Sequence, residues 1–186
     1  MSFKFKQLEI PDVVLITPEA FSDSRGLFME TYKKSEFSAN GIDCSIKQIN
    51  FSVSAKNVLR GLHYQLKPHA QAKLVQCLRG SAYDVAVDIR NGSPYFGRWV
   101  SAVLTAENRN LLWVPEGFAH GFLALEDNTE IMYGISSEYA KDSERGIIWN
   151  DPDISINWPS NEIILSEKDT MNIKLSDAEI NFIYGD

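Results

Sequence analysis

Cysteine, long apolar runs and positive charge are all in short supply in this sequence. Only Cys44 and Cys77 occur among 186 residues, and neither lies in a CxxC pair or beside a pair of histidines. This pattern argues against a disulfide framework and a cysteine zinc site, and it indicates a reducing, cytoplasmic compartment. The apolar run at residues 13–16 is short for the core of a signal peptide, and no run reaches the length of a membrane span. We therefore expect no membrane partner.

The shortage of positive charge argues against nucleic acid as a partner. The chain carries 18 Lys and Arg against 25 Asp and Glu, which gives a formal net charge of −7. A general nucleic-acid binder needs a basic face, whereas an acidic protein can still hold a phosphate in a local cationic cleft. The length and the 44% hydrophobic content predict one globular domain over residues 1–186 with a core of its own.

Helix patterns are scarce as well, and short strands separated by turns dominate the chain. Residues 81–90 alternate apolar and polar side chains, and residues 95–104 and 129–136 have the composition of further strands. Turn signals at 91–94 and 108–110 separate these segments. Many short strands at a spacing of roughly ten residues predict a mainly β fold, either a sandwich or a barrel.

The two ends of the chain are less regular. Residues 3–17 predict short strands, residues 23–26 a turn followed by a strand over 27–32, and residues 33–43 a short helix or loop. The tail from Ser137 is dense in Trp, Asp and Pro at first. It then predicts a loop leading to a C-terminal helix.

That C-terminal helix would begin near residue 176. Ser176 or Asp177 would cap it, because both residue types accept hydrogen bonds from the free amides of a first helical turn.

The most informative stretch is LRGLHYQLKPHAQAKLV, residues 59–75, which gathers Arg60, His63 and Lys73. A base with a pKa near neutrality and two cations on a β scaffold suit an anionic substrate that must lose a proton. Regular alternation places Arg60 and His63 on opposite faces, so their joint use needs a bulge, which Gly61 permits. The alternative is a surface strand that carries a stray histidine and ordinary solvated cations.

A second polar row precedes this stretch. Gln48, Asn50 and Ser52 share one face by alternation, and the apolar residues between them share the other. Amides and hydroxyls are costly to bury without partners. The polar row therefore faces solvent or lines a polar cleft, and both interpretations stay open on the residues alone.

Five motifs in order, LRGLHYQ, DVAVDIR, FGRWV, VPEGFAHGF and GIIWNDPDISINWP, closely resemble the dTDP-4-dehydrorhamnose 3,5-epimerase family. The resemblance covers residues 25–169. It implies a jelly-roll fold of the cupin type with short peripheral helices and a C-terminal extension, and a homodimer. It also implies epimerisation of dTDP-4-dehydro-6-deoxyglucose at C3 and C5, which gives dTDP-4-dehydrorhamnose on the way to dTDP-rhamnose for polysaccharide synthesis.

The resemblance implies that neither a metal nor another cofactor takes part. PEGFAH is similar to the second cupin motif, PxGxxH, but the first cupin motif requires HxH. The sequence has His63-Tyr64-Gln65 instead, so two of the usual metal ligands are missing.

Family resemblance also assigns the catalytic roles. His63 is the base, oriented by Asp169, and Tyr133 is the acid on the opposite face, because a phenol with a pKa near 10 keeps its proton at pH 7. Lys73 is placed to stabilise the enolate oxygen. The residues alone leave open that Tyr133 is a core or interface aromatic. Asp84, a second carboxylate, has a position that allows a supporting role.

Further residues match positions that contact the ligand. Arg25 and Arg60 match phosphate contacts, which suits the bidentate geometry of arginine, and Tyr139 matches the residue that stacks on thymine. His120 matches a second histidine of the cleft, although the residues alone are equally compatible with a buried corner histidine. We expect Arg25 or Glu30 to act across the dimer interface. The remaining matches are Gln48, Asn50, Lys73, Glu144 and Lys168.

Three alternatives compete with this interpretation. The nearest is a relative that epimerises only C3 or only C5, or that uses another nucleotide sugar. A metal-dependent cupin is a second, against which the missing HxH speaks. A cupin that binds sugars without catalysis is a third, and it would tolerate the loss of His63.

Overall fold

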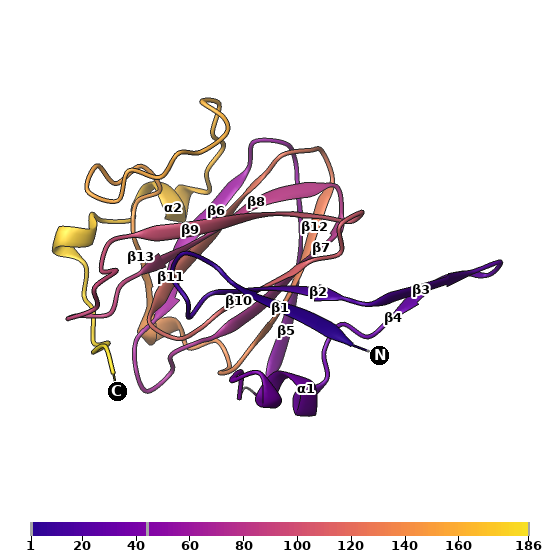
Figure 1. Ribbon diagram of the computed structural model, residues 1–186. Coiled ribbons are helices and arrows are strands. Elements are labelled where there is room, and N and C mark those ends of the chain that lie inside the picture. Colours follow the sequence, from indigo (N-terminus) through magenta and orange to yellow (C-terminus); the bar gives the residue numbers. More distant parts are fainter. Residues whose placement is uncertain (1, 44, 186) are drawn as a thin grey trace.

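Two antiparallel β-sheets lie face to face in the computed structural model, which describes residues 2–43 and 45–185 (Figure 1). The six-stranded sheet has the order β1 (Phe3–Gln7), β2 (Val14–Pro18), β10 (Leu111–Val114), β7 (Lys73–Arg79), β12 (Thr129–Ile135) and β5 (Gln48–Ser54). The five-stranded sheet has the order β13 (Glu144–Gly146), β6 (Leu59–Gln65), β11 (Phe118–Ala124), β8 (Ser81–Asp88) and β9 (Trp99–Thr105). The mainly β architecture predicted from turn spacing is confirmed.

The space between the sheets is filled by apolar side chains that alternate along the strands. Val75 of β7 and Leu112 of β10 meet Ala86 of β8 and Phe118 and Phe122 of β11 in one buried cluster. Val75 and Cys77 on β7, like Leu112 and Val114 on β10, are every second residue, which is the period of a pleated strand. The free thiol of Cys77 is buried in the same cluster, and Cys44 lies outside the described residues.

Both outer faces of the sandwich are partly covered. On the six-stranded sheet, the helix α1 (Lys34–Ala39) places the fully buried Phe37 against Trp113 and Leu74. On the five-stranded sheet, the segment after β13 lays Ile147, Ile154 and other apolar residues over β6 and β8. The covering segments stabilise the sandwich, because they bury apolar faces that would otherwise lie in water.

The C-terminal segment differs from the sequence prediction. It contains the 3-10 helices η1 (Lys141–Ser143) and η2 (Leu175–Asp177) and the short helix α2 (Glu167–Thr170). The predicted C-terminal helix after Ser176 is wrong, because the chain there runs extended and places Phe182 against Tyr64 of β6. The short helix or loop expected over 33–43 is confirmed as α1.

A hairpin projects from the body of the sandwich. Its strands β3 (Ala20–Asp23) and β4 (Gly26–Met29) pair only with each other, so they form an arm that extends beyond the end of β2 (Figure 1). The turn expected at residues 23–26 is confirmed. Phe28, near the tip, is 61% exposed.

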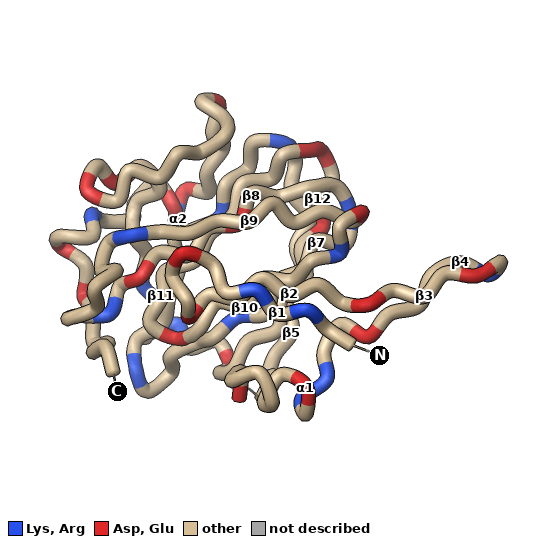
Figure 2. Tube along the Cα trace, in the orientation of Figure 1, with Lys and Arg blue, Asp and Glu red and all other residues tan. Residues whose placement is uncertain are grey.

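The distribution of charge and the lengths of the helices are both consistent with the expectations from the sequence. Figure 2 shows Lys and Arg mixed with Asp and Glu around the chain, and the tip of the β3–β4 arm carries both signs. Among the described residues, every helix is too short or too polar to cross a membrane.

Candidate active site

A bulge in β6 brings Arg60 and His63 to the same side of the sheet. In the pairing with β11, His63 lies opposite His120 and Arg60 opposite Phe122, so three steps on β6 match two on β11. Gly61 occupies the bulge with a φ of +147°, and a Cβ there would lie 2.6 Å from the Cα of Gly121. The predicted need for a glycine at this bend is confirmed.

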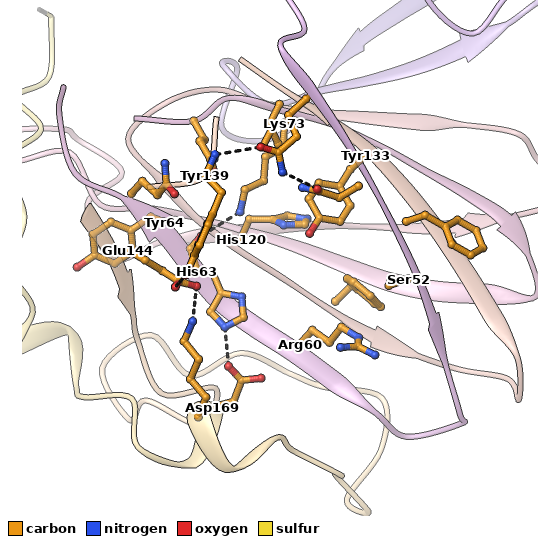
Figure 3. A pocket seen from close by; sticks show the side chains of 18 of the residues that line it. Ser52, Arg60, His63, Tyr64, Lys73, His120, Tyr133, Tyr139, Glu144 and Asp169 are labelled. Carbon is orange, nitrogen blue, oxygen red and sulfur yellow. Dashed lines mark hydrogen bonds and ion pairs between the residues drawn. The ribbon is translucent and has the colours of Figure 1, made fainter. Parts of the chain in front are cut away.

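The side chains that the sequence singled out meet in one pocket between the two sheets, with a volume of about 480 Å³ (Figure 3). This volume lies within the range typical of small-molecule sites. The predicted site residues that line it are Gln48, Asn50, Arg60, His63, Lys73, His120, Tyr133, Tyr139, Glu144, Lys168 and Asp169. The polar row of β5 therefore faces the pocket and not solvent.

His63 and Asp169 form a hydrogen-bonded dyad at one side of this pocket. The Nε2 atom of His63 lies 2.5 Å from Oδ1 of Asp169, and the other ring nitrogen faces the cavity (Figure 3). Burial raises the pKa of the Asp169 carboxyl, but the hydrogen bond and charge of His63 outweigh it and leave the pKa below its ordinary value. A carboxylate that stays ionised favours the protonated imidazole after proton transfer.

The position of Asp169 is set by a helix cap. Ser166 is the N-cap of α2, and its hydroxyl accepts a hydrogen bond from the backbone N–H of Asp169 at 3.1 Å. The cap fixes the first turn of a four-residue helix that is too short to be stable by itself. Ser166 thus aims the carboxylate at His63.

Lys73 enters the pocket from the opposite sheet and is buried. Its ammonium donates a hydrogen bond to the backbone carbonyl of His63 at 3.1 Å. Burial lowers the pKa of Lys73 to about 8, against the opposing charges of Asp84 and Glu144. A partly desolvated cation of this kind interacts strongly with a negative charge that develops nearby.

His120 pairs with a second carboxylate. Its Nε2 atom lies 2.8 Å from Oδ1 of Asp84, and both side chains are almost completely buried. Burial lowers the pKa of His120, although the charge of Asp84 opposes that shift. His120 lines the same pocket as His63, and its contact with a ligand stays a prediction.

Tyr133 of β12 faces the pocket from the six-stranded sheet, across from His63 of β6 (Figure 3). Burial raises the pKa of its phenol, and the hydrogen bond with Asn50 reduces that shift only in part. Tyr133 therefore holds its proton at neutral pH. A hydroxyl that remains protonated can donate that proton to a stronger base.

Polar side chains form a continuous network at the pocket mouth. The Tyr139 hydroxyl donates to Glu144 at 2.6 Å, and Glu144 also binds the Lys168 ammonium at 2.5 Å. Burial raises the pKa of Glu144, but its hydrogen bonds to Lys168 and Tyr139 lower the pKa by more than burial raises it. The net shift is downward. Gln48 accepts a hydrogen bond from the backbone N–H of Tyr139 at 3.0 Å, which ties this loop to β5.

Arg25 and Glu30 do not belong to this pocket within the described chain. Arg25 sits at the tip of the β3–β4 arm, where its 88% exposed guanidinium binds Asp23. Glu30 follows the arm and keeps one buried carboxylate oxygen with no hydrogen-bond partner in the described residues. Neither residue reaches the cavity of its own chain.

Several lining residues were not predicted as site residues. Ser166 was detectable, because Ser-x-x-Asp before a short helix is a capping pattern. Gln65 was also missed; it holds the mouth loop by accepting a hydrogen bond from the backbone N–H of Ala140 at 2.8 Å. The others are Phe51, Ser52, Tyr64, Gln71, Phe122 and Ile135. No group of three or more His, Cys, Asp or Glu suited to a metal occurs in the described part of the chain.

Comparison with known proteins identifies the family to which this chain belongs. The sequence model of the dTDP-4-dehydrorhamnose 3,5-epimerase family matches residues 7–177. A Shigella flexneri protein of that name is 51% identical over 172 residues, which are 92% of this chain and 95% of the relative.

Two solved structures extend the comparison. The Legionella pneumophila epimerase, in complex with dTDP-4-keto-L-rhamnose, superposes with a TM-score of 0.92 at 39% identity, covering 96% of this chain and 95% of the other. A 3'-monoepimerase from Streptomyces bikiniensis, in complex with dTDP-quinovose, has a TM-score of 0.86 at 37% identity, covering 91% and 87%. These likenesses confirm the predicted fold, a jelly roll of the epimerase type.

Proposed function

We propose that this chain, an isomerase that belongs to the dTDP-4-dehydrorhamnose 3,5-epimerase family, converts dTDP-4-dehydro-6-deoxyglucose to dTDP-4-dehydrorhamnose. The substrate has a ketone at C4, which acidifies the C–H bonds at C3 and C5. Each inversion removes a proton from one face of the sugar and returns a proton to the other face. The reaction therefore needs a base and an acid on opposite sides of the ring.

The observation that carries this proposal is the placement of His63 and Tyr133. The imidazole comes from β6 of one sheet and the phenol from β12 of the other, and both side chains line a single cavity (Figure 3). A sugar ring bound between the sheets would have the base at one face and the acid at the other. His63 takes the proton from carbon, and Tyr133 donates its proton to the opposite face of the same carbon.

The remaining side chains of the pocket support the charges of this reaction. Asp169 stabilises the imidazolium that forms when His63 takes a proton. Lys73 stabilises the enolate oxygen at C4, where negative charge appears during each inversion. The proton movements balance without a metal or a redox cofactor, because the enolate receives at carbon one proton for each proton removed.

Arg60 and Tyr139 are proposed to bind the nucleotide half. Arg60 lines the pocket, and its guanidinium binds the Ser54 hydroxyl at 3.1 Å and the Val53 carbonyl at 3.3 Å, so it is oriented before any ligand arrives. An oriented guanidinium suits a diphosphate. Tyr139 is 53% exposed at the mouth, where a base can stack on its ring. The Legionella relative contains a dTDP-sugar in its structure.

Turnover in deuterated water, followed by NMR, tests the reaction. Deuterium at both C3 and C5 of the product supports the proposal, because each inversion takes its new proton from a group in exchange with solvent. Deuterium at C3 alone indicates a single-centre epimerase like the Streptomyces bikiniensis relative. The absence of deuterium at both carbons, with substrate bound, would refute the epimerase mechanism.

A homodimer completes the site in this proposal. The β3–β4 arm carries Arg25 away from its own pocket, and the outer face of β5 exposes Ile49, Phe51 and Val53 beside that pocket. Exposed apolar rows of this kind are typical of protein interfaces. We propose that a second copy covers this row and brings its Arg25 and Glu30 to the nucleotide.

Subunit complementation tests that arrangement. Arg25→Ala and His63→Ala subunits are each expected to have little activity alone. A mixed dimer contains one site with an intact His63 from one copy and an intact Arg25 from the other. Mixing the two variants, with subunit exchange, should therefore restore part of the activity. If Arg25 acts on the pocket of its own chain, mixing restores nothing.

Three expectations from the sequence remain predictions. Analytical ultracentrifugation tests the homodimer, and metal analysis of active protein tests the absence of a bound metal. The cytoplasmic location inferred from cysteine use also remains a prediction, with which the free thiol of Cys77 is compatible.

A further inference from the structure

Asp84 is a carboxylate in the interior of the sandwich that the proposed reaction does not yet use. Its side chain is completely buried on β8, on the inward face that also contributes Ala82 and Ala86 to the core between the sheets. One oxygen, Oδ1, binds His120 at 2.8 Å. The other, Oδ2, has no hydrogen-bond partner within the described residues. A buried carboxylate with a free oxygen is costly unless a positive charge lies close to it.

Lys73 is a buried cation on the opposite sheet that faces the same interior. Its strand β7 gives Val75 and Cys77 to the same core between the sheets, so Lys73 and Asp84 project into one interior. Within the described residues the Lys73 ammonium donates a single hydrogen bond, to the His63 carbonyl, and a neutral carbonyl does not balance the charge. Among charged groups, Asp84 favours the charged form of Lys73 most strongly, ahead of Glu144.

We propose that Asp84 is a positioning residue with two tasks: it fixes the ring of His120 and keeps the Lys73 ammonium charged inside the pocket. This inference rests on the proposed function, because it concerns the cation that stabilises the enolate. Asp84 does not line the pocket and so acts through Lys73 and His120.

The sign of the effect follows from the buried lysine. Burial brings the pKa of Lys73 down to about 8, and the negative charge of Asp84 opposes that decrease. Removing the charge lets the pKa fall further, so that Lys73 loses its proton within the neutral range. A neutral amine stabilises an enolate less well than an ammonium does. The charged and titratable groups around Lys73 are His63 on β6, Asp84 on β8, His120 on β11, Tyr133 on β12 and Glu144 on β13.

The pH profile of Asp84→Asn tests the proposal. The amide keeps a hydrogen-bonding group toward His120 and removes only the charge. We expect kcat of the wild type to decline above pH 8 as Lys73 deprotonates, and the same decline in Asp84→Asn to begin about one to three pH units lower. Asp84→Ser, with a smaller side chain, provides a second neutral variant if the amide packs badly.

Two controls separate this effect from loss of structure. Asp88→Asn neutralises another fully buried carboxylate of β8, one that binds Arg90 at 2.6 Å outside the pocket, and it should leave the decline near pH 8 unmoved. In a Lys73→Arg background the cation cannot titrate, so Asp84→Asn should no longer shift the profile. An unshifted decline in Asp84→Asn, or an equal shift in the Lys73→Arg background, would overturn the proposal.

A measurement without substrate distinguishes this inference from the proposed function. The 13Cε resonance of Lys73, assigned by its loss in Lys73→Arg, reports the pKa of the amine directly by NMR titration. Asp84→Asn should lower that pKa whether or not the sugar is turned over. An unchanged pKa in a folded variant refutes the inference alone, whereas inactive wild-type protein refutes the function alone.

Discussion

His63 and His120 lie opposite each other on β6 and β11, yet each imidazole binds a carboxylate of its own, Asp169 or Asp84. The side chain of His63 is 30% exposed, and that of His120 is 7% exposed. The two dyads therefore differ in access: His63 can meet a ligand and exchange protons with water, whereas His120 is held in the interior. On this asymmetry we propose that His63 transfers the proton and that His120 orients the ligand.

The first prediction concerns the base. His63→Ala should lower kcat by roughly 10²–10⁴-fold, the usual contribution of a general base. Binding of dTDP, measured by calorimetry, should stay within a few-fold of the wild type, because Arg60 and Tyr139 are unchanged. His69→Ala removes an exposed histidine that does not line the pocket and serves as the control. A His63→Ala protein with normal turnover would support a different base.

The second prediction separates the two faces of the sugar. Tyr133→Phe keeps the ring and removes the acid, so net epimerisation should fall by roughly 10²–10⁴-fold. His63 can still remove and return a proton on its own face. NMR in deuterated water should therefore show deuterium entering the substrate at C3 or C5 without inversion.

Tyr83→Phe is the matched control for this change. The Tyr83 hydroxyl accepts a hydrogen bond from Ser101 outside the pocket. Removing this hydroxyl should therefore leave both deuterium exchange and inversion unchanged. Exchange and inversion that decline together in Tyr133→Phe would show that Tyr133 acts on binding and not as the acid.

The third prediction concerns the helix cap behind the dyad. Ser166→Ala should reduce the free energy of unfolding by about 0.5–2 kcal/mol, the usual cost of losing an N-cap. It should also lower kcat, but by less than Asp169→Asn, because the carboxylate remains present and is only less well held. Urea unfolding and steady-state kinetics measure the two effects. Ser160→Ala, which removes a loop hydrogen bond to the backbone of Glu162, should change stability alone.

The fourth prediction concerns the bulge in β6. Gly61→Ala places a Cβ against the backbone of Gly121 and a side chain at positive φ, so we expect a loss of about 1–3 kcal/mol and a marked decrease in activity. Gly92→Ala shares the positive φ but meets open space, and thus reports the cost of the conformation alone. If both variants have equal stability and activity, close packing at Gly61 is not what aligns the strand.

Much of the site was predictable from the sequence because strands have a fixed period. Alternation correctly placed Gln48 and Asn50 on one face of β5, and the conflict between alternation and a shared cleft correctly identified Gly61 as a bulge. The direction of the β3–β4 arm was not predictable, because a hairpin that pairs only with itself gives no signal of where it points.

The helix predicted for the C-terminal segment was wrong for a related reason. The composition of this segment favours a helix. Its apolar side chains instead pack along the outer face of the five-stranded sheet; they are Leu175, Ala178, Ile180 and Phe182. An extended chain satisfies that face, and Ile183 forms a β-bridge with Asn91 instead of continuing a helix. Tertiary packing outweighs local preference in such a segment.

As a single edge strand, β5 limits which insertions and deletions this protein tolerates. Its polar row forms a wall of the ligand pocket, and its apolar row, of which Phe51 also borders the pocket, is exposed on the other face of the same strand. A slip of one residue in the pairing with β12 would exchange the two rows. Inserting or deleting one residue in the segment 45–47, just before β5, would then replace the polar lining of the pocket with an apolar one, with almost no change in composition.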